Sequence, residues 1–365
     1  MSKYSLVPLT EMAEVHDYLR EPVSQHIRST RIGTYPYFGA TGQAGWIDDY
    51  RQDGRYVLLG EDGAPFLDPD KTKAYIVEGK CWVNNHAHVL KGKEGVCDDD
   101  FLCYALNWAD YTNAVTGSTR LKLPQKTMDR LLIPKPHIET QRIIASLLKT
   151  RLAEIGAARQ AAEMQLAEVS KLADAVVVQS LKQVTTNPCQ LGEVLSEVKE
   201  GIGNDWREYA VLGATRDGLA PAKEPPGKHA AKYKPVFVGT VFYNPMRILI
   251  GSIAFVDEDD TPGITSPDYV VLQGREGLVD SRWFYYWLRS HLGVQCINSL
   301  ARGAVRERML FNRLAEGKIV LPDYTTQERA SVALKELNGV RIKLKQQLAE
   351  IALLPQKILL QAFEN

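Results

Sequence analysis

The feature that most constrains this chain is a long internal repeat, each copy of which ends in a helix with apolar residues at heptad spacing. Pro136 and Gln141 in the first copy match Pro322 and Gln327 in the second at a constant offset of 186 residues. Solenoid repeats have much shorter periods, of about 20–50 residues. A repeat of this length therefore predicts two copies of one module, each followed by its own long helix.

Two stretches have the periodicity of a coiled coil. The first begins near Glu139 and continues for about 45 residues, or roughly 65 Å of helix. The second extends to the C-terminus, and Pro355 should kink it or start a new segment there. The predicted stripes are Leu148, Leu152, Ile155, Ala162, Leu166, Val169, Ala173, Val176 and Ser180 in the first helix, and Ala333, Leu337, Val340, Leu344, Gln347, Ile351, Leu354 and Ile358 in the second. Because neither helix can bury its stripe alone, we expect the two helices to pack antiparallel against each other.

The predicted fold is α/β (α+β): two similar domains separated by two long antiparallel coiled-coil helices, with pseudo-two-fold symmetry. We expect the first domain at residues 1–137, the central helix at 138–186, the second domain at 187–322 and the C-terminal helix at 323–365. The predicted strands are Arg55–Gly60, Ala74–Val77, His86–Leu90, Val236–Tyr243, Leu249–Val256 and Tyr269–Leu272, and the predicted short helices are Phe101–Trp108 and Arg282–Leu288.

The composition is ordinary for a soluble protein, with 45% hydrophobic and 24% charged residues. No apolar run approaches the roughly 20 residues that span a bilayer, and the N-terminus has no signal-peptide pattern. We therefore expect a cytoplasmic protein with no membrane partner. The five cysteines are scattered and form no C-x-x-C pair, which argues against a disulfide framework and a zinc site.

Basic residues are clustered although the net charge is zero. Residues 119–135 carry five basic residues against one acid, and residues 299–318 carry five against two. These clusters lie at equivalent places, just before each proline boundary. A third cluster occupies residues 216–234. A solvated surface explains any single cluster, whereas repetition at matched positions favours a face that contacts phosphates.

The order of the motifs resembles the specificity (S) subunits of type I restriction–modification systems over essentially the whole chain. The first module carries the resemblance in YPYFGATGQAGWIDDY (35–50), YVLLGEDGA (56–64), WVNNHAHVL (82–90), TGSTRLKL (116–123) and IPKPHIETQRIIASLL (133–148). The second carries it in YNPMRILIGSIAFV (243–256), ITSPDYVVL (264–272) and the stretch from Arg302 to Pro322. No single motif is very specific, but their doubled order around two long helices is.

The resemblance implies a non-catalytic subunit in which each module recognises one half of an asymmetric, bipartite site in double-stranded DNA. In that family the helices set the spacing between the half-sites and dock two modification (methyltransferase) subunits, which bring S-adenosylmethionine and methylate adenine. Two restriction subunits can join the complex. No cofactor is expected in this chain. The modules differ strongly in sequence, which predicts two unlike half-sequences.

Candidate DNA contacts follow from the basic clusters and from the loops that align with the family. They are Asn85, His86, Thr116, Ser118, Arg120 and Lys122 in the first module and Arg216, Arg302, Arg306 and Arg308 in the second. Candidate partner-docking residues on the helices are Leu152, Leu166, Val169, Leu337, Leu344 and Ile351.

Two other classes of function stay open at this point. Asp70, Glu78 and Lys80 fit a loose P-D…(D/E)-x-K pattern of Mg²⁺-dependent nucleases, although a turn followed by a strand explains the pattern equally well. A purely structural scaffold would use the helices alone. His86 and His88 lie two residues apart and could share a metal, but with no third ligand evident a hydrogen-bonded structural role is the stronger interpretation.

Overall fold

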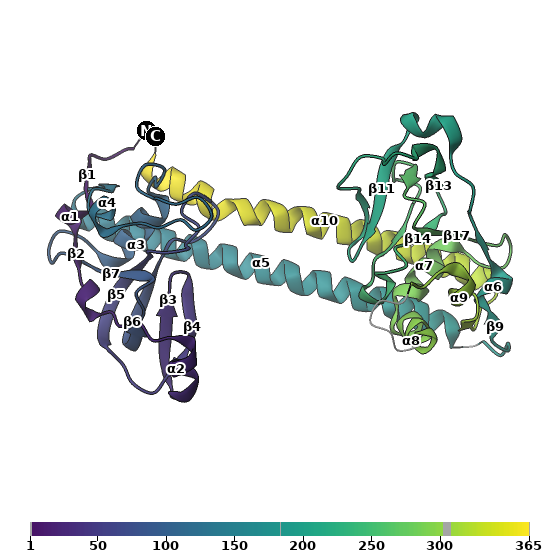
Figure 1. The fold of residues 1–365 in the computed structure, drawn as a ribbon, viewed down its shortest axis with the longest axis horizontal. Coiled ribbons are helices and arrows are strands. Elements are labelled where there is room, and N and C mark those ends of the chain that lie inside the picture. The colour runs from purple at the N-terminus through teal and green to yellow at the C-terminus, as the bar shows by residue number, and fades with distance from the viewer. Residues whose placement is uncertain (1, 183, 302–307, 365) are drawn as a thin grey trace. The chain divides into compact units, whose positions relative to one another are not determined.

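The structure is a computed structural model that describes residues 2–182, 184–301 and 308–364 (Figure 1). The chain divides into two compact units, Met1–Glu163 with Gln346–Asn365 and Met164–Lys345. Each of the two long helices, α5 (Ile138–Leu181) and α10 (Tyr324–Phe363), contributes one part to each unit. The division into four segments at residues 137, 186 and 322 stays a prediction, although α5 and α10 begin within two residues of the expected starts.

The first unit is built around a six-stranded sheet in the order β2-β7-β5-β6-β3-β4 (Figure 1). All neighbouring strands are antiparallel except β3 and β6. The strands are β1 (Leu6–Pro8), β2 (Ala13–Val15), β3 (Tyr35–Gly39), β4 (Gly42–Ile47), β5 (Gln52–Gly60), β6 (Ala74–Val83), β7 (Ala87–Gly92) and β8 (Leu132–Pro134). The short helices are α1 (Leu9–Met12), η1 (Asp17–Leu19), α2 (Gln25–Thr30), α3 (Asp99–Trp108) and α4 (Gln125–Met128).

Strand β5 is apolar at consecutive positions because both of its faces are buried. Val57 and Leu59 join the core that includes α3, whereas Leu58 packs on the other face with Val77 and Val89. This is the alternation expected of a pleated strand. The Asp98 side chain caps α3 by accepting the Phe101 N–H at 3.1 Å, so the polar sequence before the helix determines where it begins.

The C-terminal end of α10 belongs to the core of the first unit. Phe363 is fully buried, and its ring centroid lies 5.7 Å from that of Phe101 and 5.5 Å from that of Trp108. The Lys3 N–H donates to the Phe363 carbonyl at 2.8 Å, so the two ends of the chain lie side by side (Figure 1).

The second unit holds two four-stranded sheets, β10-β17-β14-β15 and β12-β11-β16-β13. Its strands are β9 (Cys189–Gln190), β10 (Leu195–Glu197), β11 (Ala210–Thr215), β12 (Gly218–Pro221), β13 (Lys234–Val236), β14 (Val241–Tyr243), β15 (Ile253–Phe255), β16 (Gly263–Thr265), β17 (Val270–Gly274) and β18 (Lys318–Ile319). Its helices besides the long ones are α6 (Leu191–Val194), η2 (Gly203–Glu208), η3 (Ala230–Lys232), η4 (Ile248–Ile250), α7 (Ser281–Arg289), α8 (His291–Leu300) and α9 (Phe311–Leu314). Val241 and Tyr243 face the core that includes α7, while Phe242 packs against the second sheet.

The repeat predicted from the sequence is confirmed in the order of elements. In the first unit β1 pairs with β8, and α1 leads into β2, which pairs with β7. In the second unit β9 pairs with β18, and α6 leads into β10, which pairs with β17. Helix α3 corresponds to α7 and α4 to α9. The predicted mixed α/β fold with two long helices is therefore confirmed, and the insertions between matched elements differ.

Two predicted strands of the second module are wrong in extent. Val236–Tyr243 is two strands joined by a turn at Gly239, and Leu249–Val256 begins as the 3-10 helix η4 and turns at Gly251. Both glycines have φ of 82°, a left-handed conformation that breaks a strand and favours glycine. Of the two outcomes expected at Pro355, a kink or a new segment, the new segment is wrong, since α10 continues through this residue.

The predicted stripe is only partly buried on α5, where Val177 and not Val176 is fully buried, and it is also misplaced in part on α10. Leu148, Ala162 and Val169 are buried as expected. On α10, Leu344 and Ile351 are buried, but Val340 is 46% exposed and Leu354 38% exposed. The buried positions before Leu344 include Ala330 and Leu334. A heptad counted from Leu334 leads to position 341, so Val340 lies one residue away from the buried face of α10. Among the described helices, none is both long enough and apolar enough to cross a bilayer.

Candidate nucleic-acid interface

Three loops of the first unit meet around Glu61 and Asp62, the two residues that follow β5. The segment after α3 bridges to this loop, since Asp62 pairs with Lys122 and the Leu123 N–H donates to the Glu61 carbonyl at 2.7 Å. The Glu61 N–H donates to the His86 carbonyl at 2.7 Å. Four of the candidate DNA contacts thus lie in one place, the first-module loop cluster: His86, Thr116, Arg120 and Lys122.

The two cations of this cluster, Arg120 and Lys122, are paired with its two acids, and the His86 ring lies beside Asp62. Arg120 Nε lies 2.7 Å from Asp62 Oδ1, Lys122 Nζ 3.3 Å from Glu61 Oε1, and His86 Nδ1 3.4 Å from Asp62 Oδ2. The Arg120 side chain is 61% exposed and that of Lys122 is 54% exposed. The carboxylates are more sheltered, with Asp62 26% exposed and Glu61 14% exposed, so each pair joins an exposed cation to a half-buried acid.

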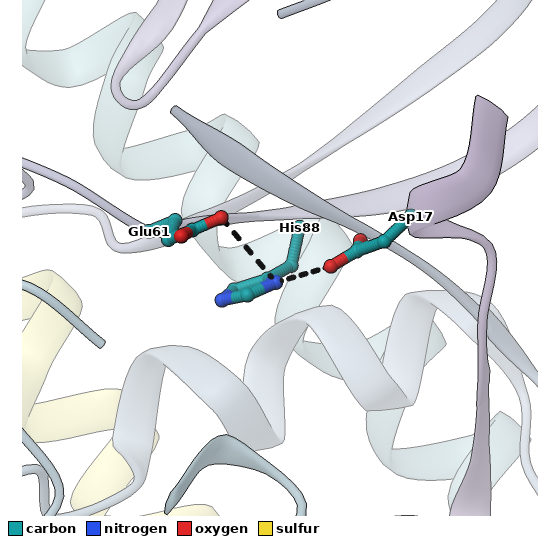
Figure 2. Close-up of side chains that lie close together, drawn as sticks. All are labelled: Asp17, Glu61 and His88. Carbon is teal, nitrogen blue, oxygen red and sulfur yellow. Dashed lines mark hydrogen bonds and ion pairs between the residues drawn. The ribbon is translucent and has the colours of Figure 1, made fainter. Parts of the chain in front are cut away.

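An ion network around the buried His88 ring lies next to the cluster and connects its loops to β7. Figure 2 shows the His88 ring between the carboxylates of Asp17 and Glu61. His88 Nδ1 lies 2.7 Å from Asp17 Oδ2, and Nε2 lies 2.9 Å from the Leu123 carbonyl oxygen. Arg20 pairs with both carboxylates. Because Leu123 directly follows Lys122, this network supports the backbone that carries the exposed cations.

The side chains of Asp17, Glu61 and His88 also place their possible ligand atoms within 4.8 Å of one another, as metal ligands would. Their acceptor positions are already used, however. Asp17 accepts from the Val89 N–H at 2.8 Å as well as pairing with Arg20, and Glu61 pairs with Arg20 and Lys122. A divalent cation would have to displace the Arg20 guanidinium, so the geometry is that of an ion-pair network. The hydrogen bonds of His88 are consistent with the structural role expected from the sequence, and His86 lies outside this group.

The remaining first-module candidates are Asn85 and Ser118, which are exposed. Asn84 was not among the predicted residues, but its buried side chain accepts the His86 N–H at 2.8 Å and so positions this loop.

A second cationic and aromatic surface was also missed, around α2 and the edge strand β4. The Arg28 guanidinium lies 4.5 Å from the Tyr37 ring centroid and that of Arg31 lies 4.7 Å from the Trp82 centroid. Trp46 on β4 is 57% exposed, unusual for a residue type that is highly buried on average. A pair of arginines in the short stretch from Gln25 to Ile32, which has no acid, was the available signal in the sequence.

In the second unit the two described candidate cations, Arg216 and Arg308, lie in separate loops. Arg216 is exposed in the turn between β11 and β12, and its carbonyl accepts a bond from Arg289 at 2.6 Å. Arg308 Nη2 lies 3.1 Å from Asp268 Oδ1, with its side chain 50% exposed. Arg302 and Arg306 lie outside the described residues.

The nuclease alternative finds no support in the geometry. Asp70 lies in the turn before β6, while Glu78 lies four residues beyond Ala74, the first residue of that strand, or about 13 Å along it at roughly 3.3 Å per residue. Lys80 Nζ lies 4.4 Å from the Tyr50 ring centroid, and hydrogen bonding to Tyr50 raises the pKa of Lys80. The two carboxylates are not brought together around one ion.

The helix residues predicted to dock partners are largely turned inward. Val169, Leu344 and Ile351 are more than nine-tenths buried, and Leu152, Leu166 and Leu337 are half-buried. The three buried residues therefore offer no free surface, and docking by the other three stays a prediction. Other apolar side chains on the long helices are exposed instead, among them Ile143, Leu147, Met164, Leu172, Val332, Ile342 and Leu353.

Comparison with known proteins agrees with this architecture. Residues 1–162 match the family model of the type I restriction modification DNA specificity domain. Over 141 residues the chain is 32% identical to S.HindORF215P, a Haemophilus influenzae protein assigned to the type I restriction enzyme specificity subunits. That match covers 39% of this chain and 35% of the relative, so it spans about a third of the relative's length.

Solved structures match over nearly the whole chain at low sequence identity. The S subunit of a type I restriction-modification system from M. genitalium has a TM-score of 0.58 at 14% identity, covering 100% of this chain and 97% of that one. A chain from a structural study of complex assembly and conformational transition of the type I R-M system has a TM-score of 0.64 at 15% identity, covering 99% and 98%. The HsdS subunit from Thermoanaerobacter tengcongensis has a TM-score of 0.50 at 15% identity, covering 99% and 97%.

This fold is that of a two-module protein in which each module is followed by its own long helix. In its first 162 residues the chain matches the specificity domain of type I restriction–modification systems, and its fold resembles that of solved S subunits of such systems. The resemblance predicted from the sequence is thus confirmed.

Proposed function

We propose that this chain is the DNA-specificity subunit of a type I restriction–modification complex. The observation that carries the proposal is the specificity domain of the first module together with a second module that repeats its element order. Each module would recognise one half of an asymmetric bipartite site. Affinity would come largely from cations on phosphates, and specificity from a few side chains that reach base edges.

The chain itself would be non-catalytic. Two modification subunits would bind S-adenosylmethionine and methylate adenine in each half-site, and two restriction subunits can join that assembly. The geometry around Asp70, Glu78 and Lys80 supports no hydrolytic centre of its own.

Enrichment from a pool of random duplexes tests the proposal, with the chain co-purified with its modification subunit. We expect two unlike half-sequences at one fixed spacing. Binding without any enriched sequence would favour the scaffold alternative, and cut duplexes would favour the nuclease. If duplexes are cut, loss of cleavage on Glu78→Ala would identify the nuclease site.

The long helices would act as the ruler between the half-sites. One heptad inserted after Glu163 in α5 and one after Lys345 in α10 would lengthen both helices by about 10 Å at roughly 1.5 Å per residue. The spacer should then grow by about three base pairs at roughly 3.4 Å each, with both half-sequences unchanged. An unchanged spacer would refute the ruler.

The modification subunits would dock on apolar side chains that the long helices leave exposed. Ile143 is 69% exposed and Leu147, one turn later on the same face, is 50% exposed. Changing both to glutamate should abolish co-purification of the modification subunit without changing the stability of the first unit. Lys149→Glu, at an exposed position nearby, is the matched control. An intact complex with the double variant would place the docking surface elsewhere.

Charged substitutions in the buried stripe should act differently. Leu166→Asp or Leu344→Asp would place a charge at a half-buried or buried position, so the pairing of the helices and partner docking should be lost together.

A further inference from the structure

A buried glutamine occupies the fourth position of each long helix. Gln141 in α5 and Gln327 in α10 are both fully buried. A buried side-chain amide costs free energy unless its donors and acceptor are paired. The partners of these two amides therefore indicate what the residues do.

Both amides make the same three hydrogen bonds. Gln141 Oε1 accepts the Asp98 N–H at 3.0 Å, and its Nε2 donates to the carbonyls of Val96 and Pro136, both at 2.9 Å. In the second unit, Gln327 Oε1 accepts the Asp280 N–H at 3.0 Å, and its Nε2 donates to the carbonyls of Leu278 at 3.0 Å and Pro322 at 2.9 Å. We call each arrangement a glutamine clamp.

Each clamp joins three pieces of backbone that must be aligned. Asp98 and Asp280 are the N-cap residues of α3 and α7, and Pro136 and Pro322 lie two residues before the first residue of α5 and α10. One amide thus connects the first turn of a long helix both to the chain entering it and to the start of the helix that covers the module's sheet.

The apolar contacts around the clamps differ between the modules. The third residue of the short helix is Phe101 in α3 and Trp283 in α7, and both are buried. Apolar contact is also non-directional, whereas a hydrogen bond weakens steeply when its angle departs from linearity. The apolar contacts differ between the modules and are non-directional, whereas the hydrogen bonds of the clamp are the same in both. We therefore attribute to the clamp the direction in which each long helix leaves its module.

We propose that Gln141 and Gln327 are positioning residues for DNA-site spacing: each sets the direction in which its long helix leaves its module. This inference rests on the proposed bipartite recognition. The clamps lie in the interior and touch no base, so they affect the distance between half-sites and not the sequence of either one.

The test repeats the random-duplex enrichment with Gln141→Met and Gln327→Met, each in the full chain with the modification subunit. Methionine has a similar length but removes all three hydrogen bonds. Each variant should recover both wild-type half-sequences but at several neighbouring spacings. The preference for the best spacer over one that is a base pair longer should fall on the order of tenfold, as expected for losing a few buried hydrogen bonds. Leu148→Ala is the control, because it removes a buried core contact on α5 without touching a clamp.

A single sharp spacing in both glutamine variants would overturn the inference, as would equal broadening in Leu148→Ala. If wild type itself enriches no bipartite site, the proposed function fails. Hydrogen exchange then tests the clamp separately. Gln141→Met should expose the Asp98 amide and the first turn of α5 while the rest of α3 stays protected, and unchanged exchange there would refute the clamp.

Discussion

Replacing Phe363 with alanine should lower the free energy of unfolding of the first unit by about 3–5 kcal/mol. The side chain is fully buried although it lies two residues from the end of the chain, and it contacts the rings of Phe101 and Trp108. Transfer of such a side chain from water contributes about 1.5–3 kcal/mol, and the cavity left behind adds the rest. Domains of this kind have only about 5–15 kcal/mol of stability in total, so this one residue should account for a large share.

Urea denaturation of the full chain, followed by hydrogen exchange of peptides from each unit, measures this effect. Peptides of the first unit should lose protection at lower urea, with those of the second unit little changed. Leu360→Ala is the matched control, since Leu360 lies about one turn earlier on α10 and is 36% exposed; its cost should be about 1 kcal/mol. If Phe363→Ala costs no more than Leu360→Ala, the C-terminus is not part of this core.

Three further predictions concern other parts of the chain. Arg282→Met should destabilise the second unit by about 3–5 kcal/mol, because it leaves the buried Asp257 carboxylate unpaired; a urea midpoint unchanged from wild type would contradict this. Burial raises the pKa of Cys97 and Cys103 to about 12, above about 8.5 for an unfolded thiol. Their contribution to stability is therefore complete below about pH 8.5 and declines as the pH rises toward 12. The double alanine variant should lose less stability than wild type between pH 8 and pH 10, and an equal loss in urea titrations would refute the assignment. Arg308→Ala should reduce the slope of log K against log salt by about 0.9 and alter binding at the second half-site only; an equal effect on both halves would mean that Arg308 contacts something else.

The loop cluster indicates how the first module would present its cations. Arg120 and Lys122 extend from a loop whose backbone is held by the ion network of Asp17, Arg20, Glu61 and His88. In the proposed function, the ion pairs with the half-buried carboxylates of Glu61 and Asp62 would restrict these side chains before DNA binds. A preorganised side chain loses less conformational entropy on binding.

The periodic features of this protein could be read from the sequence alone. Heptad spacing identifies α5 and α10, and the constant offset of Pro136 and Gln141 from their counterparts identifies the repeat. Both follow from local rules, since helix periodicity and repeated motifs need no knowledge of distant contacts. The basic clusters likewise located Arg120 and Lys122, because charge runs are visible in one dimension.

Only the tertiary structure decided the contacts between segments that are far apart in the chain. The pairing of Asp62 with Arg120 and of Gln141 with Asp98 joins residues 58 and 43 positions apart, and no local pattern encodes such neighbours. The same holds for Phe363, whose place in the first module's core depends on α10 ending there. Periodicity along a helix is set by the backbone's own geometry, whereas the partner of a polar side chain is set by which loops the folded chain brings together.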